Sequence, residues 1–153
     1  MLDSDAMLVG RMALAALLGY AIGFERELRG KSAGERTFAL IGLGTAAIVS
    51  LGSEISGDAA SRVIQGVAAG IGFIGAGLIF QSDRGTVLGL TTAAAVWAAA
   101  AVGVLCGSGA YLPAIAGTVL AALILELDKI PFLRRVEPRR LREEGKRETP
   151  RDE

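Results

Sequence analysis

The residues best suited to chemistry lie in one short stretch, from Phe24 to Thr37. It contains seven charged residues in fourteen positions, and an almost uncharged apolar segment adjoins it on each side. Charges packed this closely at the edge of a membrane predict either mutual ion pairs or a polar binding site, since a lone charge there is costly. The candidate polar cluster consists of Glu25, Arg26, Glu27, Lys31, Glu35, Arg36 and Thr37.

The mixed signs of this cluster restrict the ligands that it could take. A hard cation such as Mg²⁺ prefers several oxygen ligands and no neighbouring ammonium group, so an all-carboxylate metal cage is disfavoured. Metal ligands therefore stay unassigned, no cofactor is expected, and magnesium binding cannot be derived from these residues. Gly30 and Gly34 predict a tight, shaped turn within the stretch.

The composition argues against most kinds of enzyme. The chain has no histidine, and its single cysteine, Cys106, can form neither an intramolecular disulfide nor a cysteine metal cluster. No phosphate-binding loop, nucleophile elbow or zinc spacing is present. We therefore expect a protein that is not an enzyme, without a nucleic-acid partner.

Five apolar blocks surround the cluster and must position it. A transmembrane helix needs about 20 residues, with a range of about 17–25, which the first, third and fourth blocks reach. The fourth block lacks the polar stripe that a soluble helix would carry, which disfavours a soluble bundle. The pattern predicts an all-α, polytopic membrane bundle of about five helices. The blocks are Ala6–Phe24, Thr37–Leu51, Val63–Phe80, Thr86–Leu105 and Tyr111–Leu125.

The distribution of lysine and arginine predicts the orientation. With five spans, the loop after the first, the loop after the third and the C-terminal tail share one side and hold fourteen basic residues. The opposite side holds Arg62 alone. By the positive-inside rule, the N-terminus lies outside and the C-terminus in the cytoplasm. Residues 1–127 are then the transmembrane domain, and residues 128–153 a basic, partly disordered cytoplasmic tail.

The third block is dense in glycine, which allows close approach of neighbouring backbones. We expect a central helix with packing contacts, and tight packing is the favoured interpretation. The alternative is an unwound helix that lines a pore, which a break near Gly72 to Gly77 would indicate. The glycines concerned are Gly66, Gly70, Gly72, Gly75 and Gly77.

Arg11 is the one charge inside the first block. Two interpretations stay open for it. Its guanidinium group could reach outward to the membrane surface, or it could pair with an acidic side chain on the same side, such as Glu54 or Asp58.

Three ordered motifs resemble the MgtC/SapB family of bacterial inner-membrane proteins. The first runs from Glu25-Arg26-Glu27 through Gly30 and Gly34 to Arg36-Thr37. The second is the glycine-rich segment Gly70–Gly77, and the third is Gly89–Trp97, which contains Thr91 and Thr92. The resemblance covers about residues 6–127 and adds Thr91, Thr92 and Trp97 to the expected packing residues.

This resemblance implies a multi-pass protein of the bacterial inner membrane linked to growth under magnesium limitation. The family's best-known member resembles a regulator that acts on the proton-translocating ATP synthase. The present sequence departs from that member because it lacks the soluble, ACT-like C-terminal domain, so the membrane domain is the expected functional unit.

Two functions remain open. The favoured one is a regulator or scaffold in stress adaptation, whose partners are the lipid bilayer and either further copies of itself or another membrane complex. The alternative is a transporter of magnesium, protons or a small solute, with the charged cluster as a gate on the cytoplasmic side.

Overall fold

The structure is a computed structural model and describes residues 2–53, 57–81 and 87–127. The described residues form five helices and one short hairpin, which confirms the expected all-α class. The predicted basic tail, residues 128–153, lies outside them. The elements are α1 (Leu2–Leu28), α2 (Glu35–Ser53), α3 (Gly57–Leu78), β1 (Phe80–Gln81), β2 (Val87–Leu88), α4 (Leu90–Gly107) and α5 (Tyr111–Glu126).

Within the described part of the chain, three helices are long and apolar enough to cross a membrane. They are the segments Asp5–Leu28 of α1, Ala60–Leu78 of α3 and all of α4, Leu90–Gly107. Helix α5, Tyr111–Glu126, is apolar but shorter. A membrane protein is therefore indicated, while the count of five spans and the orientation stay predictions.

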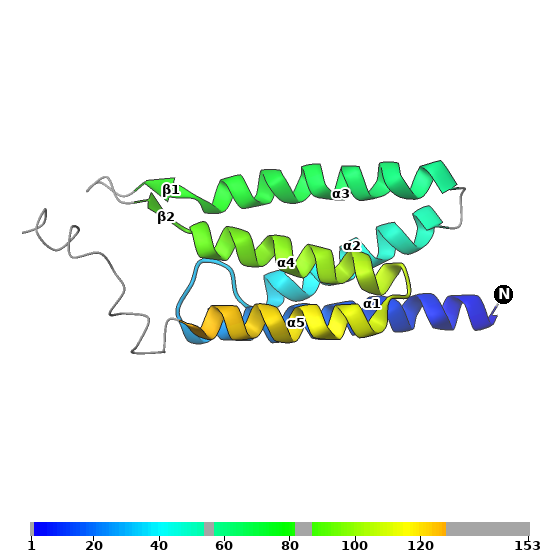
Figure 1. The fold of residues 1–153 in the computed structure, drawn as a ribbon, viewed down its shortest axis with the longest axis horizontal. Coiled ribbons are helices and arrows are strands. Elements are labelled where there is room, and N and C mark those ends of the chain that lie inside the picture. The colour runs from blue at the N-terminus through cyan, green and yellow to red at the C-terminus, as the bar shows by residue number, and fades with distance from the viewer. Residues whose placement is uncertain (1, 54–56, 82–86, 128–153) are drawn as a thin grey trace, which may run out of the picture. The chain divides into compact units, whose positions relative to one another are not determined.

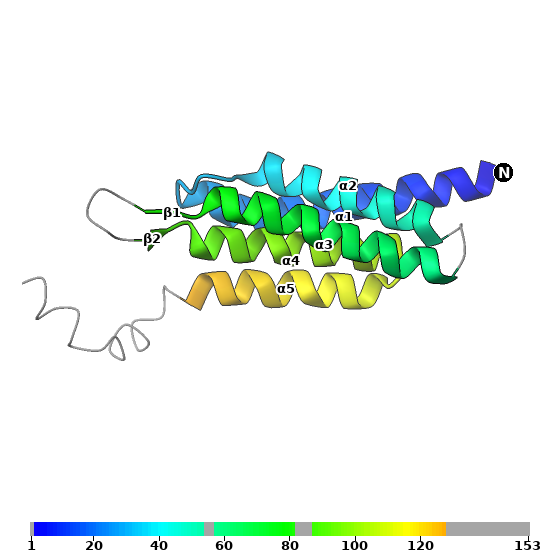
Figure 2. The ribbon, with the colours of Figure 1, turned by 90° about the horizontal axis from the view of Figure 1, so that it is seen from above.

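The chain divides by its contacts into two units, Met1–Ala122 and Leu123–Glu153. Helices α1 to α4 belong to the first, and its core lies where α1, α2 and α4 pack against one another (Figures 1 and 2). The side chains of Ile22, Phe38 and Val96, one from each helix, are fully buried there. Burial of such apolar side chains leaves few gaps in the core.

Glycines bring these three helices into close contact. A Cβ atom at Gly19 of α1 would lie 2.4 Å from the carbonyl oxygen of Phe38, and one at Gly42 of α2 would lie 2.4 Å from that of Ala15. A Cβ atom at Gly103 of α4 would lie 2.8 Å from the carbonyl oxygen of Gly42. The α1–α2–α4 core therefore depends on glycine at positions where any side chain would collide with a neighbouring backbone.

Helix α3 packs against α2 and α4 at the side of this core (Figures 1 and 2). Only 11% of its membrane-length segment is buried, against 56% for α4. The expected central position is therefore wrong, although the expected packing contacts are present, with α2 and α4. The helix continues without interruption through Gly72–Gly77, so the unwound alternative finds no support.

The segment between α3 and α4 differs from the expected boundaries. The strands pair Phe80 with Leu88 and Gln81 with Val87, so α4 begins at Leu90 and not near Thr86. Gly89 precedes α4 with φ of 87°, and a Cβ atom there would lie 1.8 Å from the carbonyl oxygen of Leu78. A residue with a side chain would be strained at this left-handed, crowded position.

Arg11 is bonded to the junction of α4 and α5. Its Nη1 donates to the carbonyl oxygen of Gly107 at 2.9 Å, and its Nε to the hydroxyl of Tyr111 at 3.3 Å. Ser50 also donates to the Gly107 carbonyl, at 3.1 Å. Of the two acidic partners considered, Glu54 lies outside the described residues, and the bonds of Arg11 go to Gly107, to Tyr111 and, from Nη2 at 3.5 Å, to the sulfur of Met7.

Candidate functional site: the charged end of α1 and α2

The end of α1 is fixed by a glycine turn. The amide of Lys31 donates to the carbonyl of Arg26 at 3.1 Å, and that of Gly30 to the carbonyl of Glu27 at 2.9 Å. Gly30 has φ of 60°, so these bonds form a Schellman motif with glycine in the left-handed position. The chain then reaches α2 through a short loop, which confirms the tight turn predicted from Gly30 and Gly34.

Two charged residues on the last turns of α1 are buried. Arg26 is 1% exposed and Glu25 is 8% exposed. The Glu25 carboxylate forms salt bridges with both Arg26 and Arg29, the second of them one helical turn away. Since a buried charge without a partner is strongly destabilising, we interpret Glu25 as the counter-ion that lets both guanidinium groups lie at this end of the bundle.

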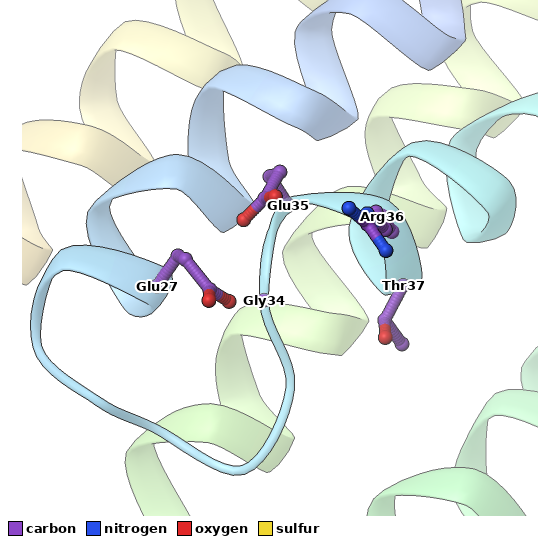
Figure 3. A pocket seen from close by; sticks show the side chains of 5 residues that line it. All are labelled: Glu27, Gly34, Glu35, Arg36 and Thr37. Atoms are coloured by element: carbon purple, nitrogen blue, oxygen red, sulfur yellow. The ribbon is translucent and has the colours of Figure 1, made fainter.

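A polar pocket of about 300 Å³ opens between the end of α1 and the start of α2. Figure 3 shows its lining: Glu27 comes from the last turn of α1, Gly34 from the loop, and the other three residues from the first turn of α2. One oxygen of Glu35, Oε2, is buried without a hydrogen-bond partner. The lining residues are Glu27, Gly34, Glu35, Arg36 and Thr37.

The carboxylate of Glu27 lies against Gly34. A Cβ atom on Gly34 would stand 1.7 Å from Oε2 of Glu27, so a side chain there would displace that oxygen. The carbonyl of Gly34 accepts a bond from the amide of Phe38 at 3.2 Å, which makes Gly34 the N-cap residue immediately before α2. A carboxylate at a helix N-terminus is favoured by the helix dipole, so Glu27 joins the end of α1 to the start of α2.

The structure thus divides the predicted cluster into two parts. Glu27, Glu35, Arg36 and Thr37 line one pocket, whereas Glu25 and Arg26 belong to the buried network. Lys31 is exposed in the loop and belongs to neither the pocket lining nor the buried network. The sequence did not reveal Arg29 as a member of the network, although its spacing of four from Glu25 was a usable signal.

The predicted packing residues differ in how closely another helix approaches them. Space is open within 4 Å of a Cβ atom built on Gly66, Gly70, Gly72 or Gly77. Gly75 is the exception, because its Cβ position lies 3.8 Å from Nε1 of Trp97 on α4. On α4, Thr92 is buried and Thr91 is exposed.

The glycines that sequence reasoning missed lie in the core. They are Gly19, Gly23, Gly42, Gly103 and Gly107, each of which would collide with a neighbouring helix if it carried a Cβ atom. Gly19 and Gly23 stand four apart on α1, and this small-residue spacing was visible in the sequence.

Comparison with known proteins decides the family. The model of the MgtC family matches residues 12–131, which include all of the charged site, α3, α4 and α5. The chain belongs to the MgtC family. This result confirms the resemblance drawn from the three sequence motifs.

Relatives within the MgtC family differ in length and in what their names say. Protein SrpB of Synechococcus elongatus is 42% identical, and the match covers 81% of this chain and 78% of that protein. The putative magnesium transporter YhiD of Escherichia coli is 45% identical, with 76% of this chain and 58% of YhiD covered. Protein MgtC of Brucella abortus is 49% identical, with 71% and 45% covered. No solved structure matches the chain.

Proposed function

We propose that this chain is a multi-pass inner-membrane regulator or scaffold that acts through contacts made within the membrane. The proposal includes five spans, with the N-terminus outside and the charged site in the cytoplasm. Membership of the MgtC family and the name of the YhiD relative link it to magnesium. Its process is adaptation to magnesium limitation, without a catalytic step of its own.

The observation that carries the proposal is the closed pairing of Glu25 with Arg26 and Arg29. A cation path needs polar groups that can exchange partners along the membrane. Among the described residues, the buried polar side chains other than Glu25 and Arg26 are all hydroxyls: Thr45, Ser50, Thr92 and Thr118. Of these, Ser50 bonds to Gly107 and Thr118 to Ala114. This interior favours a packed bundle over a conducting one.

The partner in this proposal is a membrane complex or a further copy of the chain. The family resemblance points to the proton-translocating ATP synthase as one candidate complex. The test is affinity purification of the tagged chain from native membranes in mild detergent, followed by mass spectrometry and size analysis. Recovery of a stable complex or oligomer is expected. A monodisperse monomer without partners would contradict the proposal.

A transporter is the second candidate, and the pocket beside Glu35 favours it. The unpartnered Oε2 oxygen and the space of about 300 Å³ could hold a small cation at the cytoplasmic mouth. Flux of Mg²⁺ or protons into liposomes tests it, with the wild type compared with Glu25→Gln and Arg36→Gln. Flux that is abolished in variants shown to stay folded would establish transport, and equal baseline leakage in all three would end this candidate.

A further inference from the structure

Helix α3 carries an outward face that no other part of the described chain covers. Phe73 on this face is 82% exposed, the highest value among the large apolar side chains of the described residues. At 100° per residue the face spans an arc of about 140°. It consists of Gln65, Gly66, Ala69, Gly70, Phe73 and Ala76, all of them exposed.

A groove lies beside this face, between α3 and α2. It has a volume of about 400 Å³, with Gly66 and Gly70 on the α3 wall and Ile48 on the α2 wall. Space is open above both glycines. Phe73 is thus a bulky side chain next to an unfilled hollow, and both lie on the same exposed surface.

We propose that this surface binds a second copy of the chain, in a two-fold dimer where the partner's Phe73 enters the groove between α2 and α3. Two copies in one membrane have the same orientation, so their α3 helices run parallel. Residues of the same number then lie at the same depth in the membrane. A helical side chain leans toward the preceding turn, which places the Phe73 ring level with Gly70. The ring and the groove then meet at the same depth.

The polar groups of this face favour a second copy over lipid. Gln65 is exposed within the apolar segment Ala60–Leu78, and an amide in hydrocarbon is costly without a hydrogen-bond partner. An acyl chain offers no such partner. The amide of a second Gln65 offers both a donor and an acceptor, so a two-fold pair satisfies both copies.

Charge at the N-terminal end of α3 is also self-complementary. Asp58 and Arg62 stand one turn apart on the same side of the helix as Gln65, and both are exposed. Because the helices run parallel, the acid of one copy and the base of the other differ in depth by about 6 Å, one helical turn, which the long arginine side chain spans. A partner of uniform charge would leave one of the two residues unmatched.

This inference deepens the proposed function, on which it rests, by naming a second copy as the membrane-embedded partner. The first test is disulfide cross-linking in native membranes. Ala69→Cys is placed in a Cys106→Ala background so that it is the single thiol. The matched control is Leu40→Cys on α2, since Leu40 is 67% exposed and lies 13 residues from Ser53 at the end of α2, much as Ala69 lies 12 residues from Gly57 at the start of α3.

The second test uses the open space above the glycines. Gly70→Leu fills the groove without a collision inside one chain, and Gly10→Leu on α1 is its control because space is also open there. Both variants should fold, which the melting temperature in detergent checks. Only Gly70→Leu should abolish the cross-link of Ala69→Cys.

The dimer is supported if Ala69→Cys cross-links, Leu40→Cys does not, and Gly70→Leu alone removes the product. It is overturned if Ala69→Cys gives no more product than Leu40→Cys, or if Gly70→Leu leaves the product unchanged. Recovery of another membrane complex with no cross-linked dimer would contradict this inference and leave the proposed function standing.

Discussion

Arg11 Nη1 donates a hydrogen bond of 2.9 Å to the carbonyl oxygen of Gly107, the last residue of α4. The carbonyl groups at a helix C-terminus lack helical partners and carry partial negative charge. A cation within α1 therefore finds its partner in the backbone of another helix. The bond also ties α1 to the turn that leads into α5.

Replacement of Arg11 by methionine should destabilise the bundle. The side chain keeps much of its apolar stem, but the Gly107 carbonyl loses its charged donor. A loss of about 1–3 kcal/mol is expected, as for a hydrogen bond to a charged group. Reversible unfolding in mixed micelles measures it. The exposed Arg36→Gln serves as control, and equal stability of Arg11→Met and the wild type would contradict the assignment.

Alanine at Gly42 should destabilise the α1–α2 contact, whereas alanine at Gly44 should not. A Cβ atom at Gly42 lies 2.4 Å from the carbonyl oxygen of Ala15, but space around Gly44 of the same helix is open. The expected cost at Gly42 is about 1–3 kcal/mol. Gly44→Ala should instead gain up to about 1 kcal/mol from helix propensity. Similar melting temperatures for both variants would show that the two helices are not packed this closely.

Neutralising Glu25 should be among the most damaging single changes at the charged site. Glu25→Gln leaves Arg26, which is 1% exposed, without its counter-ion. Removal of one partner of a buried pair costs about 3–5 kcal/mol. Lys31→Gln, an exposed change in the adjacent loop, should stay within about 0.5 kcal/mol. The account of the network fails if the two variants unfold at the same denaturant concentration.

Gly34→Ala and Glu27→Ala should not act independently on stability. Alone, Gly34→Ala forces the Glu27 carboxylate away from the start of α2, because the new Cβ atom would lie 1.7 Å from Oε2. With Glu27 also changed to alanine, the collision disappears, so the double variant should lose less stability than the sum of the two single changes. A double-mutant cycle measures this difference, and strict additivity would argue against the contact.

Much of the fold followed from the distribution of apolar residues and charges. The five helices lie where the apolar blocks predicted, since long uncharged segments have few other stable forms. The turn after α1 was also predictable, because Gly30 has the conformational freedom that a Schellman motif needs. The position of the candidate site was predictable too, because its charges are concentrated between two apolar helices.

The faces through which the helices pack against one another could not be derived in this way. Both α1 and α3 contain glycines four residues apart, and nothing in their spacing says that Gly19 meets Phe38 while Gly66 faces open space. Which glycine face is used depends on how the helices come together. Likewise, Glu25 and Glu27 are near neighbours in sequence, but they point to different surroundings, the buried network and the open pocket.

The central claim is that this bundle spans the membrane with its charged loop in the cytoplasm. Labelling by a membrane-impermeant maleimide tests it most directly, on Lys31→Cys and Ser61→Cys in a Cys106→Ala background; both native residues are exposed. The account predicts that Ser61→Cys reacts in intact cells and that Lys31→Cys reacts only after the membrane is permeabilised. Labelling of Lys31→Cys in intact cells would contradict it.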